Sequence, residues 1–199
     1  KRINELTAGD IERFFRDASG KAGVDAIVSL TGFSLVGGPA YNDADAAVEL
    51  LASLNVPYVA AQATEFQTLA DWRASERGLT PVETVMSLGI PELDGAIAPT
   101  VIGGRDGSGG LMQADAERVA TLARRTARMI ALRKMPRAMR RLAVTIYGFP
   151  PNAGAIGSAA WLSVFESLWN VLRDLKDAGY GVDLPDSREA LEDAILNGN

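Results

Sequence analysis

The sequence predicts an α/β fold in which a parallel sheet is flanked by helices in a Rossmann-like arrangement. Short apolar runs bounded by turn residues alternate with amphipathic segments of helical spacing, and this alternation is typical of βα units. The chain has 199 residues, of which 47% are hydrophobic, so it can bury one complete core or parts of two. We therefore expect one nearly complete α/β unit over residues 1–136 and the start of a second over residues 137–199.

The first unit is predicted to contain two buried strands and a third, less regular one. Residues 25–31 and 56–61 are short apolar runs of the kind found in parallel sheets, and Pro57 stands at a strand start, where its missing N–H is tolerated. Residues 96–102 are also strand-like, although Pro99 interrupts them. Helices are expected over 6–18, 43–54, 68–76, 81–88 and 114–135, and the glycine-rich residues 103–110 predict a loop.

The second unit is predicted to begin with a strand, a glycine-rich loop and a long helix, at residues 142–147, 148–157 and 158–178. This order would direct backbone N–H groups of the loop beyond the edge of the sheet. The loop is not a P-loop, because no Lys-Ser or Lys-Thr pair follows its last glycine, and it lacks the G-x-G-x-x-G pattern. A short strand at 182–184 and a helix at 187–196 are expected to follow.

The composition restricts the chemistry that the chain can perform. It contains no cysteine, which excludes disulfides and thiolate catalysis, and no histidine, which removes the commonest general base and metal ligand. Acid–base or metal chemistry must therefore use carboxylates, the backbone, Lys, Arg or Tyr. The net charge of -5 disfavours nucleic-acid binding. Neither a transmembrane segment nor a signal peptide is predicted.

Basic residues gather in one stretch: nine of the twenty Lys and Arg residues lie between Arg118 and Arg141. Arg124, Arg125 and Arg128 fall mostly on the helix face opposite Val119, so a solvated face is the favoured interpretation. Binding of a partner subunit is the alternative.

Two turns carry candidate polar groups. Residues 37–42 follow a strand and lead into a helix, so either Asn42 or Asp43 caps that helix, or the turn is part of a ligand site beyond the strand ends. Pro91-Glu-Leu-Asp-Gly95 places Glu92 and Asp94 on a predicted turn, where paired carboxylates could accept protons or bind Mg²⁺. The residues alone favour a plain exposed turn. Glu65 is a third acid, predicted to lie just after a strand end.

Several of these segments together resemble the large subunit of magnesium chelatase, which inserts Mg²⁺ into protoporphyrin IX for chlorophyll and bacteriochlorophyll synthesis. The matching strings, in the order of the family, are Gly32-Phe-Ser-Leu-Val-Gly-Gly-Pro-Ala-Tyr41, Glu65-Phe-Gln-Thr-Leu69, Pro91-Glu-Leu-Asp-Gly95, Pro99-Thr100, Gly104-Arg105, Phe149-Pro-Pro-Asn-Ala-Gly154 and Ala160-Trp-Leu-Ser-Val-Phe-Glu166. Because the family protein is several times longer, the chain is expected to be an internal segment of it.

The resemblance implies a role for each matching residue. Glu92 is the first candidate for the carboxylate that binds the metal and accepts a pyrrole proton, with Asp94 as an orienting partner and Glu65 as a further metal ligand. Arg105 is expected to bind a porphyrin propionate. Gly37, Gly38, Asn42 and Asn152 are expected to line the substrate site.

The resemblance also implies the setting of the reaction. ATP would be used by separate AAA+ motor subunits, and the protein would lie in the cytoplasm, or in the plastid stroma of a plant or alga. Three alternatives stay open: a cobaltochelatase large subunit that inserts cobalt into a corrinoid, a scaffold segment that docks the ATPase subunits, and an α/β ligand-binding domain without catalysis.

Overall fold

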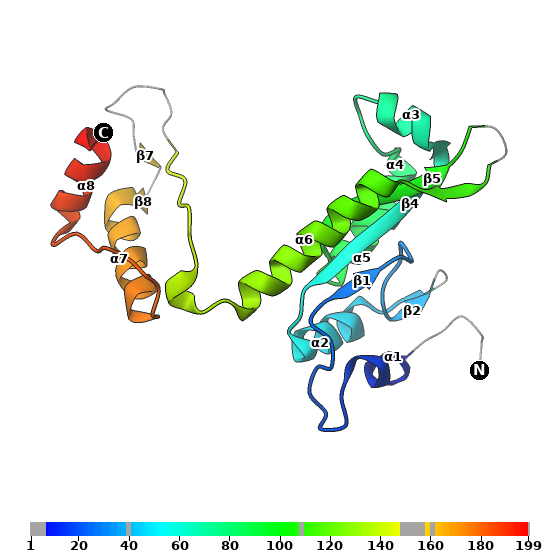
Figure 1. The fold of residues 1–199 in the computed structure, drawn as a ribbon, viewed down its shortest axis with the longest axis horizontal. Coiled ribbons are helices and arrows are strands. Elements are labelled where there is room, and N and C mark those ends of the chain that lie inside the picture. The colour runs from blue at the N-terminus through cyan, green and yellow to red at the C-terminus, as the bar shows by residue number, and fades with distance from the viewer. Residues whose placement is uncertain (1–6, 39–40, 108–109, 148–157, 160–161, 199) are drawn as a thin grey trace. The chain divides into compact units, whose positions relative to one another are not determined.

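The computed structural model describes residues 7–38, 41–107, 110–147, 158–159 and 162–198. The chain divides into two compact units, residues 1–131 and residues 132–199 (Figure 1). The first unit contains the larger sheet and its flanking helices, and the second contains short strands and two helices. Among the described residues, no helix combines the length and the apolar character needed to cross a bilayer.

The first unit is built on a four-stranded sheet with the order β1-β4-β5-β6. Strands β1 (Ile27–Ser29), β4 (Tyr58–Thr68) and β5 (Ile97–Arg105) are parallel, which confirms the predicted α/β class. Strand β6 (Met112–Ala114) pairs antiparallel with β5.

Two expectations about strand ends in this sheet were wrong. β5 continues to Arg105, where a glycine loop was expected, because Gly103 allows β6 to approach: a Cβ there would lie 2.2 Å from the carbonyl oxygen of Gln113. β4 likewise continues to Thr68, so Glu65 lies within the strand and not after it.

A bulge accommodates Pro99 inside β5. Val59 is paired with Ile97 and Ala61 with Thr100, so β5 contains one more residue than β4 between these two pairs. Ala98 within this bulge has a positive φ of 51°, which few residues other than glycine adopt. The extra residue removes the need for a ladder hydrogen bond from Pro99, and the predicted strand at 96–102 is confirmed.

Helices cover both faces of the sheet, because successive residues of β4 point to opposite sides. Tyr58 and Ala60 join a buried cluster with helices α1 (Ala8–Phe15) and α2 (Ala44–Leu54). Val59 and Ala61 instead pack with Leu122 of α6 (Ala116–Lys134), which crosses the other face in Figure 1. These helices confirm the expected elements at 6–18, 43–54 and 114–135, with small differences at their ends.

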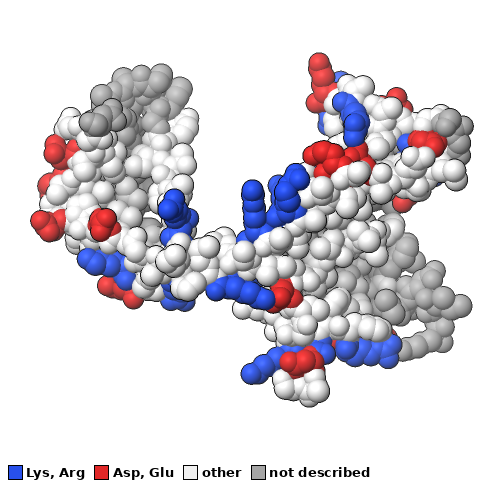
Figure 2. Space-filling view, viewed as in Figure 1, with Lys and Arg blue, Asp and Glu red and all other residues white. Residues whose placement is uncertain are grey.

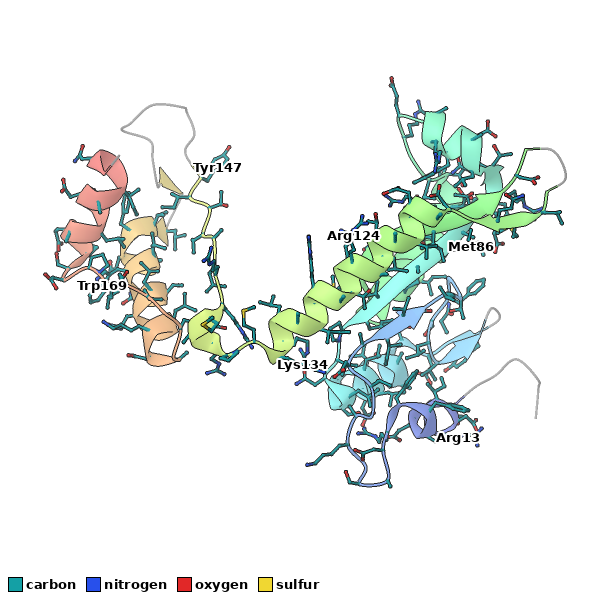
Figure 3. All side chains as sticks on the ribbon, viewed as in Figure 1. Arg13, Met86, Arg124, Lys134, Tyr147 and Trp169 are labelled. Carbon is teal, nitrogen blue, oxygen red and sulfur yellow. The ribbon has the colours of Figure 1, made fainter. Side chains whose placement is uncertain are left out.

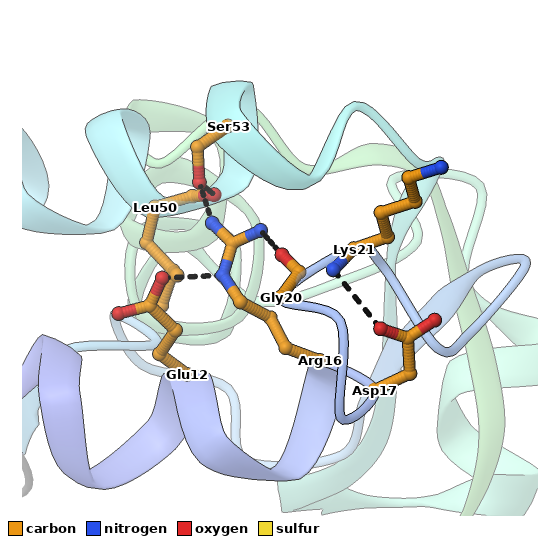
Figure 4. A network of polar contacts seen from close by, with 7 residues as sticks. All are labelled: Glu12, Arg16, Asp17, Gly20, Lys21, Leu50 and Ser53. Atoms are coloured by element: carbon orange, nitrogen blue, oxygen red, sulfur yellow. Dashed lines mark hydrogen bonds and ion pairs between the residues drawn. The ribbon is translucent and has the colours of Figure 1, made fainter.

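Arg16, just after α1, fastens that helix to α2 (Figure 4). Its guanidinium donates to the hydroxyl of Ser53 at 2.6 Å and to the carbonyl of Gly20 at 2.9 Å, and it is paired with Glu12 one turn earlier. One side chain thus contacts the last turn of α1, the turn that follows it and the neighbouring helix α2.

A continuous helical run replaces the predicted acidic turn. Helix α4 (Pro81–Thr84) passes through the π-helical turn η1 (Val85–Gly89) into α5 (Ile90–Leu93). Glu92 therefore lies on a helix, and only Asp94 and Gly95 form the turn that ends it. The prediction was wrong because it read Pro91 as the start of a turn, whereas Pro91 is the second residue of α5 and directly follows the π-helical turn. Helix α3 (Leu69–Ala74) precedes this run.

The second unit departs further from expectation. Residues 141–147 have no regular secondary structure, although a strand was predicted at 142–147, and they belong to none of the sheets formed by the described residues. Strands β7 (Ser158–Ala159) and β8 (Leu162–Ser163) form a small hairpin, so helix α7 (Val164–Asp177) starts later than the predicted residue 158. The predicted strand at 182–184 is absent. The remaining elements are η2 (Arg137–Met139) and α8 (Arg188–Asn197), which confirms the last helix.

Candidate functional site

A cavity of about 70 Å³ lies at the carboxyl edge of the sheet, where ligands of open α/β folds bind. Three segments line it: the residues that follow β1, the second half of β4, and the run from α4 into η1. Met86, labelled in Figure 3, belongs to the third segment. The lining residues are Leu30, Thr31, Gly32, Phe33, Gln62, Ala63, Glu65, Phe66, Glu83, Met86 and Ser87.

The polar lining of this cavity is rich in hydrogen-bond acceptors. Gln62 is only 4% exposed, and its side-chain oxygen Oε1 is buried without a hydrogen-bond partner. Glu65, further along β4, is exposed. None of the described lining residues is a Lys or an Arg. The charged side chains among the lining residues, Glu65 and Glu83, are therefore both acidic.

Glu83 is a buried carboxylate, 2% exposed, that shapes one wall of the cavity. Its Oε1 accepts from the backbone N–H groups of Glu65 and Phe66, both at 3.0 Å. Its Oε2 accepts from Gln67 Nε2 at 2.6 Å and from the N–H and hydroxyl of Thr80 at 3.1 and 2.9 Å.

Hydrogen bonding decides the charge of Glu83. Burial by itself raises the pKa of this carboxyl, but the hydrogen bonds from Phe66, Thr80 and Gln67 outweigh it and leave the pKa below its ordinary value. Glu83 thus stays ionised at neutral pH and fixes the backbone that carries Glu65. Sequence reasoning missed it, although Thr80-Pro-Val-Glu83 is the pattern of a helix capping box.

Asp94 is buried as well, 2% exposed, and has a structural position. Its Oδ1 accepts from the hydroxyl of Ser34 at 2.9 Å and its Oδ2 from the N–H of Leu35 at 2.6 Å. Burial raises the pKa of Asp94 above its ordinary value, although these two hydrogen bonds act in the opposite direction. The pKa of Tyr58 is raised by burial, and the charge of Asp94 adds to this effect. Asp94 therefore joins the end of α5 to the loop after β1.

Glu92, two residues earlier, has the opposite environment. Its side chain is exposed on α5 and is not among the residues that line the cavity. The structure thus separates the two predicted carboxylates: one is held inside the protein by hydrogen bonds, and the other is open to ligands from outside.

Glu65, in the second half of β4, and Arg105, at the end of β5, are brought together. The Nε of Arg105 donates to the backbone carbonyl of Glu65 at 2.7 Å, and its Nη1 donates to the carbonyl of Gly110 at 3.4 Å. Both side chains are exposed. The pair places a cation and a carboxylate on the same edge of the sheet as the cavity.

The remaining predicted residues lie elsewhere. Gly37 and Gly38 form β2 (Gly37–Gly38), which pairs with β3 (Tyr41–Asn42) in a small hairpin. Gly37 has a φ of 105°, and a Cβ there would lie 2.1 Å from the carbonyl oxygen of Tyr41. Asn42 is exposed, and the helix cap beside it is Asp43. Asn152 lies outside the described residues.

The basic stretch along α6 divides into two groups. Arg118 donates from Nε to the carbonyl of Val101 at 3.1 Å, and Arg125 donates to the hydroxyl of Thr100 at 3.3 Å, so both pack against β5. Arg124, Arg125 and Arg128 are all exposed, which confirms the predicted solvated face, although Arg125 also reaches Thr100. Arg124 points away from the sheet in Figure 3, and Figure 2 shows basic side chains on the exposed side of α6.

Comparison with known proteins identifies similar sequences over nearly the whole chain. The family model described as CobN/Magnesium Chelatase matches residues 4–199. The magnesium-chelatase H subunit of Cereibacter sphaeroides is 50% identical over 94% of this chain and 17% of its own length. The chloroplastic magnesium-chelatase ChlH protein of Oryza sativa is 42% identical over 96% of this chain and 14% of its own length. The chain therefore spans less than a fifth of the length of these relatives.

Cobalt-inserting proteins are more distant. The aerobic cobaltochelatase protein CobN of Pseudomonas aeruginosa is 31% identical over 64% of this chain and 11% of its own length. The solved catalytic subunit of cobaltochelatase from Mycobacterium tuberculosis has a TM-score of 0.64 and 28% identity, covering 79% of this chain and 14% of that one.

Proposed function

This chain belongs to the CobN/magnesium chelatase family, and we propose that it is part of the porphyrin-binding subunit of a magnesium chelatase. The complete enzyme would insert Mg²⁺ into protoporphyrin IX in chlorophyll or bacteriochlorophyll synthesis, using ATP hydrolysed by AAA+ partner subunits. The observation that carries the proposal is the 50% identity to a magnesium-chelatase large subunit over 94% of the chain. Its location would be the cytoplasm, or the stroma in a plastid-bearing organism.

The chemistry of metal insertion explains which residues matter. Two pyrrole N–H groups must lose their protons, and a tightly hydrated Mg²⁺ must exchange water for nitrogen ligands. Mg²⁺ prefers oxygen ligands and sheds water reluctantly, so a carboxylate that binds the ion and accepts a proton suits both needs. The 199-residue chain has no histidine to share this work.

We assign the roles according to exposure. Glu92 is the proposed proton acceptor, because its exposed carboxylate can meet a macrocycle that approaches from outside. Asp94 is a positioning residue, since both its oxygens are engaged with Ser34 and Leu35. Glu65 is a proposed metal ligand, and Arg105 beside it would bind a propionate bidentately. Gly37, Gly38 and Asn42 would border the macrocycle, and the substrate-binding role of Asn152 stays a prediction outside the described residues.

The replacement Glu92→Gln tests the catalytic role in the complete enzyme. Porphyrin binding, measured by fluorescence quenching, should stay unchanged, whereas Mg²⁺ insertion should fall about 100-fold or more, because the amide cannot accept the pyrrole proton. Glu49→Gln, which replaces an exposed glutamate on α2, is the matched control and should insert Mg²⁺ normally. Unchanged insertion by Glu92→Gln would remove Glu92 from the mechanism.

A second candidate function is docking of the motor subunits on the exposed basic side of α6. The double charge reversal Arg124→Glu with Arg128→Glu should then abolish assembly while porphyrin binding is kept. Normal assembly of this variant would show that the basic side of α6 is not the docking site of the motor subunits. The cobalt alternative is tested by offering Co²⁺ and a corrinoid ring to the same complex, and product formation from that pair alone would overturn the magnesium assignment.

A further inference from the structure

We propose that a groove between α3 and the start of α6 binds an acidic peptide segment of a partner protein, mainly through Trp72 and Arg118. Figure 1 shows α3 beside the end at which α6 begins. The groove has a volume of about 610 Å³ and shares no lining residue with the cavity at the carboxyl edge of the sheet. Its lining residues are Trp72, Arg73, Ser75, Gly78, Glu117 and Arg118.

An ion pair fixes the two walls of the groove. Arg73 of α3 is paired with Asp115, which directly precedes α6 and is only 6% exposed. Asp115 also accepts from the backbone N–H of Arg118, in the first turn of α6, at 3.1 Å. The hydrogen bonds from Arg118 and Arg73 hold the pKa of Asp115 below its ordinary value, so Asp115 is charged and neutralises Arg73. The groove is therefore formed before a ligand arrives, as most binding sites are.

The main observation is the half-buried pair of Trp72 and Arg118. The Nε of Arg118 donates to the carbonyl of Val101 at 3.1 Å, and its guanidinium carbon lies 5.6 Å from the centre of the Trp72 ring. None of the carboxylates in the described part of the chain is paired with Arg118. Its Nη groups are thus held in position and are able to bind a carboxylate. Tryptophan and arginine are also the residues that most often dominate the affinity of a protein interface.

The acidic groups beside this pair favour a peptide over a phosphate ligand. Glu117 places a carboxylate in the lining next to Arg118, and Asp115 occupies an N–H group of the helix start that a phosphate would use. Both oppose a ligand that carries several negative charges. A peptide offers a carboxylate to Arg118, backbone N–H donors to Glu117 and an apolar side chain to the ring of Trp72.

The face of α6 that continues from the groove favours an acidic sequence. Glu117 accepts from the hydroxyl of Thr121 at 2.9 Å, and Thr121 in turn accepts from Nη2 of Arg124 at 2.9 Å. Arg128 follows one turn later, and this spacing places all four residues on one face of the helix. A segment that leaves the groove along this face therefore meets the positive charges of Arg124 and Arg128.

The test measures peptide binding by the full-length protein in the absence of porphyrin, Mg²⁺ and ATP. The probe is a fluorescein-labelled peptide of Leu-Glu-Glu repeats, followed by fluorescence anisotropy, and a peptide of Leu-Gln-Gln repeats is its uncharged counterpart. The wild type should bind the acidic peptide about tenfold or more tightly than the uncharged one, because only the acidic peptide pairs with Arg118.

Two variants remove the proposed contacts. Trp72→Ala and Arg118→Gln should each weaken binding of the acidic peptide about tenfold or more. Arg173→Gln is the matched control, since it removes an arginine whose guanidinium carbon lies 5.3 Å from the ring centre of Trp169 in the second unit. This control should bind the acidic peptide as the wild type does.

Ser75→Glu keeps the test decisive if Trp72→Ala or Arg118→Gln disturbs the fold. Ser75 is exposed and lines the groove, so the added carboxylate should repel the acidic peptide and weaken its binding about threefold or more. Ala52→Glu adds the same charge at an exposed position of α2 and should bind the peptide normally.

Four outcomes would overturn the proposal. Equal binding of the two peptides by the wild type would show that carboxylates are not recognised, and unchanged binding by Ser75→Glu would place the peptide outside the groove. Displacement of the peptide by ATP would assign the groove to a phosphate ligand. A wild type that binds neither peptide would show that the groove is closed to a partner of this chemistry. None of these measurements involves metal insertion, so their outcome is independent of the chelatase function.

Discussion

The carboxylate of Asp94 accepts a hydrogen bond from the hydroxyl of Ser34 at 2.9 Å, across 60 residues of sequence. With the N–H of Leu35 bound to its other oxygen, Asp94 connects the end of α5 to the loop that leaves β1. These contacts hold the end of α5, the helix that carries Glu92. Asp94 is thus a buried structural residue, whereas Glu92, two residues earlier, lies at the surface.

Asp94→Ala should destabilise the first unit by about 2–4 kcal/mol, because it leaves the buried donors of Ser34 and Leu35 without an acceptor. Urea unfolding followed by circular dichroism measures the change. Asp45→Ala, which replaces an exposed aspartate in the first turn of α2, is the comparison and should change the free energy of unfolding far less. Equal stability of the wild type and Asp94→Ala would show that these hydrogen bonds contribute nothing net.

The raised pKa of Asp94 predicts a definite pH dependence. Between the unfolded value of 3.8 and the higher folded value, the folded state binds more protons than the unfolded state, so the contribution of Asp94 to stability falls as the pH rises through that window. In Asp94→Asn this component should disappear. Chemical denaturation of both proteins upward from about pH 3.5, in steps of about half a unit, checks the difference in slope; parallel curves would contradict it.

Glu83→Gln should destabilise the protein by about 2–4 kcal/mol, more than an exposed substitution would. The amide nitrogen would face donors from Gln67 and Thr80 where an acceptor oxygen now stands. Glu76→Gln, which replaces an exposed glutamate of the same unit, is the matched control. Thermal melts at neutral pH suffice, and a melting temperature for Glu83→Gln equal to that of the control would contradict the structural role.

Gly104→Ala should destabilise the pairing of β4 with β5 by about 1–3 kcal/mol through overpacking. A Cβ at this position would lie 1.9 Å from the hydroxyl oxygen of Thr64 and 3.2 Å from its Cβ. Gly107→Ala is the control, since a Cβ there meets no atom within 4 Å. Urea unfolding should show that Gly104→Ala is clearly less stable than Gly107→Ala. Equal free energies of unfolding for the two variants would show that Thr64 can move aside.

The elements that sequence reasoning predicted well are those with a local signal. The strands near Ile27 and Tyr58 are apolar runs between turn residues, and α2 has a cap and a regular apolar face. These three elements can therefore be predicted without knowing which elements pack beside them. The failed strand at 142–147 has an equally good pattern, but a strand also needs a hydrogen-bonding partner, which no pattern within the segment supplies.

The candidate site was harder to predict, because its residues are defined by burial. Nothing in the string Pro91-Glu-Leu-Asp-Gly95 distinguishes the exposed Glu92 from the buried Asp94. Gln62 is hidden in the same way within an apolar run. Glu83 is different, since its capping-box pattern with Thr80 is visible in the sequence, and only the three hydrogen bonds from Glu65, Phe66 and Gln67 required the fold.

The π-helical turn Val85–Gly89 determines the direction, around the helix axis, in which the side chains of the following helix α5 point. Such a turn behaves as a single-residue insertion in an α-helix. Each residue of an α-helix advances the chain by about 100°, so shortening η1 by one position would swing Asp94 to another side of the axis and away from Ser34. The spacing between Thr80 and Gly95 is therefore as constrained as the identity of the residues within it.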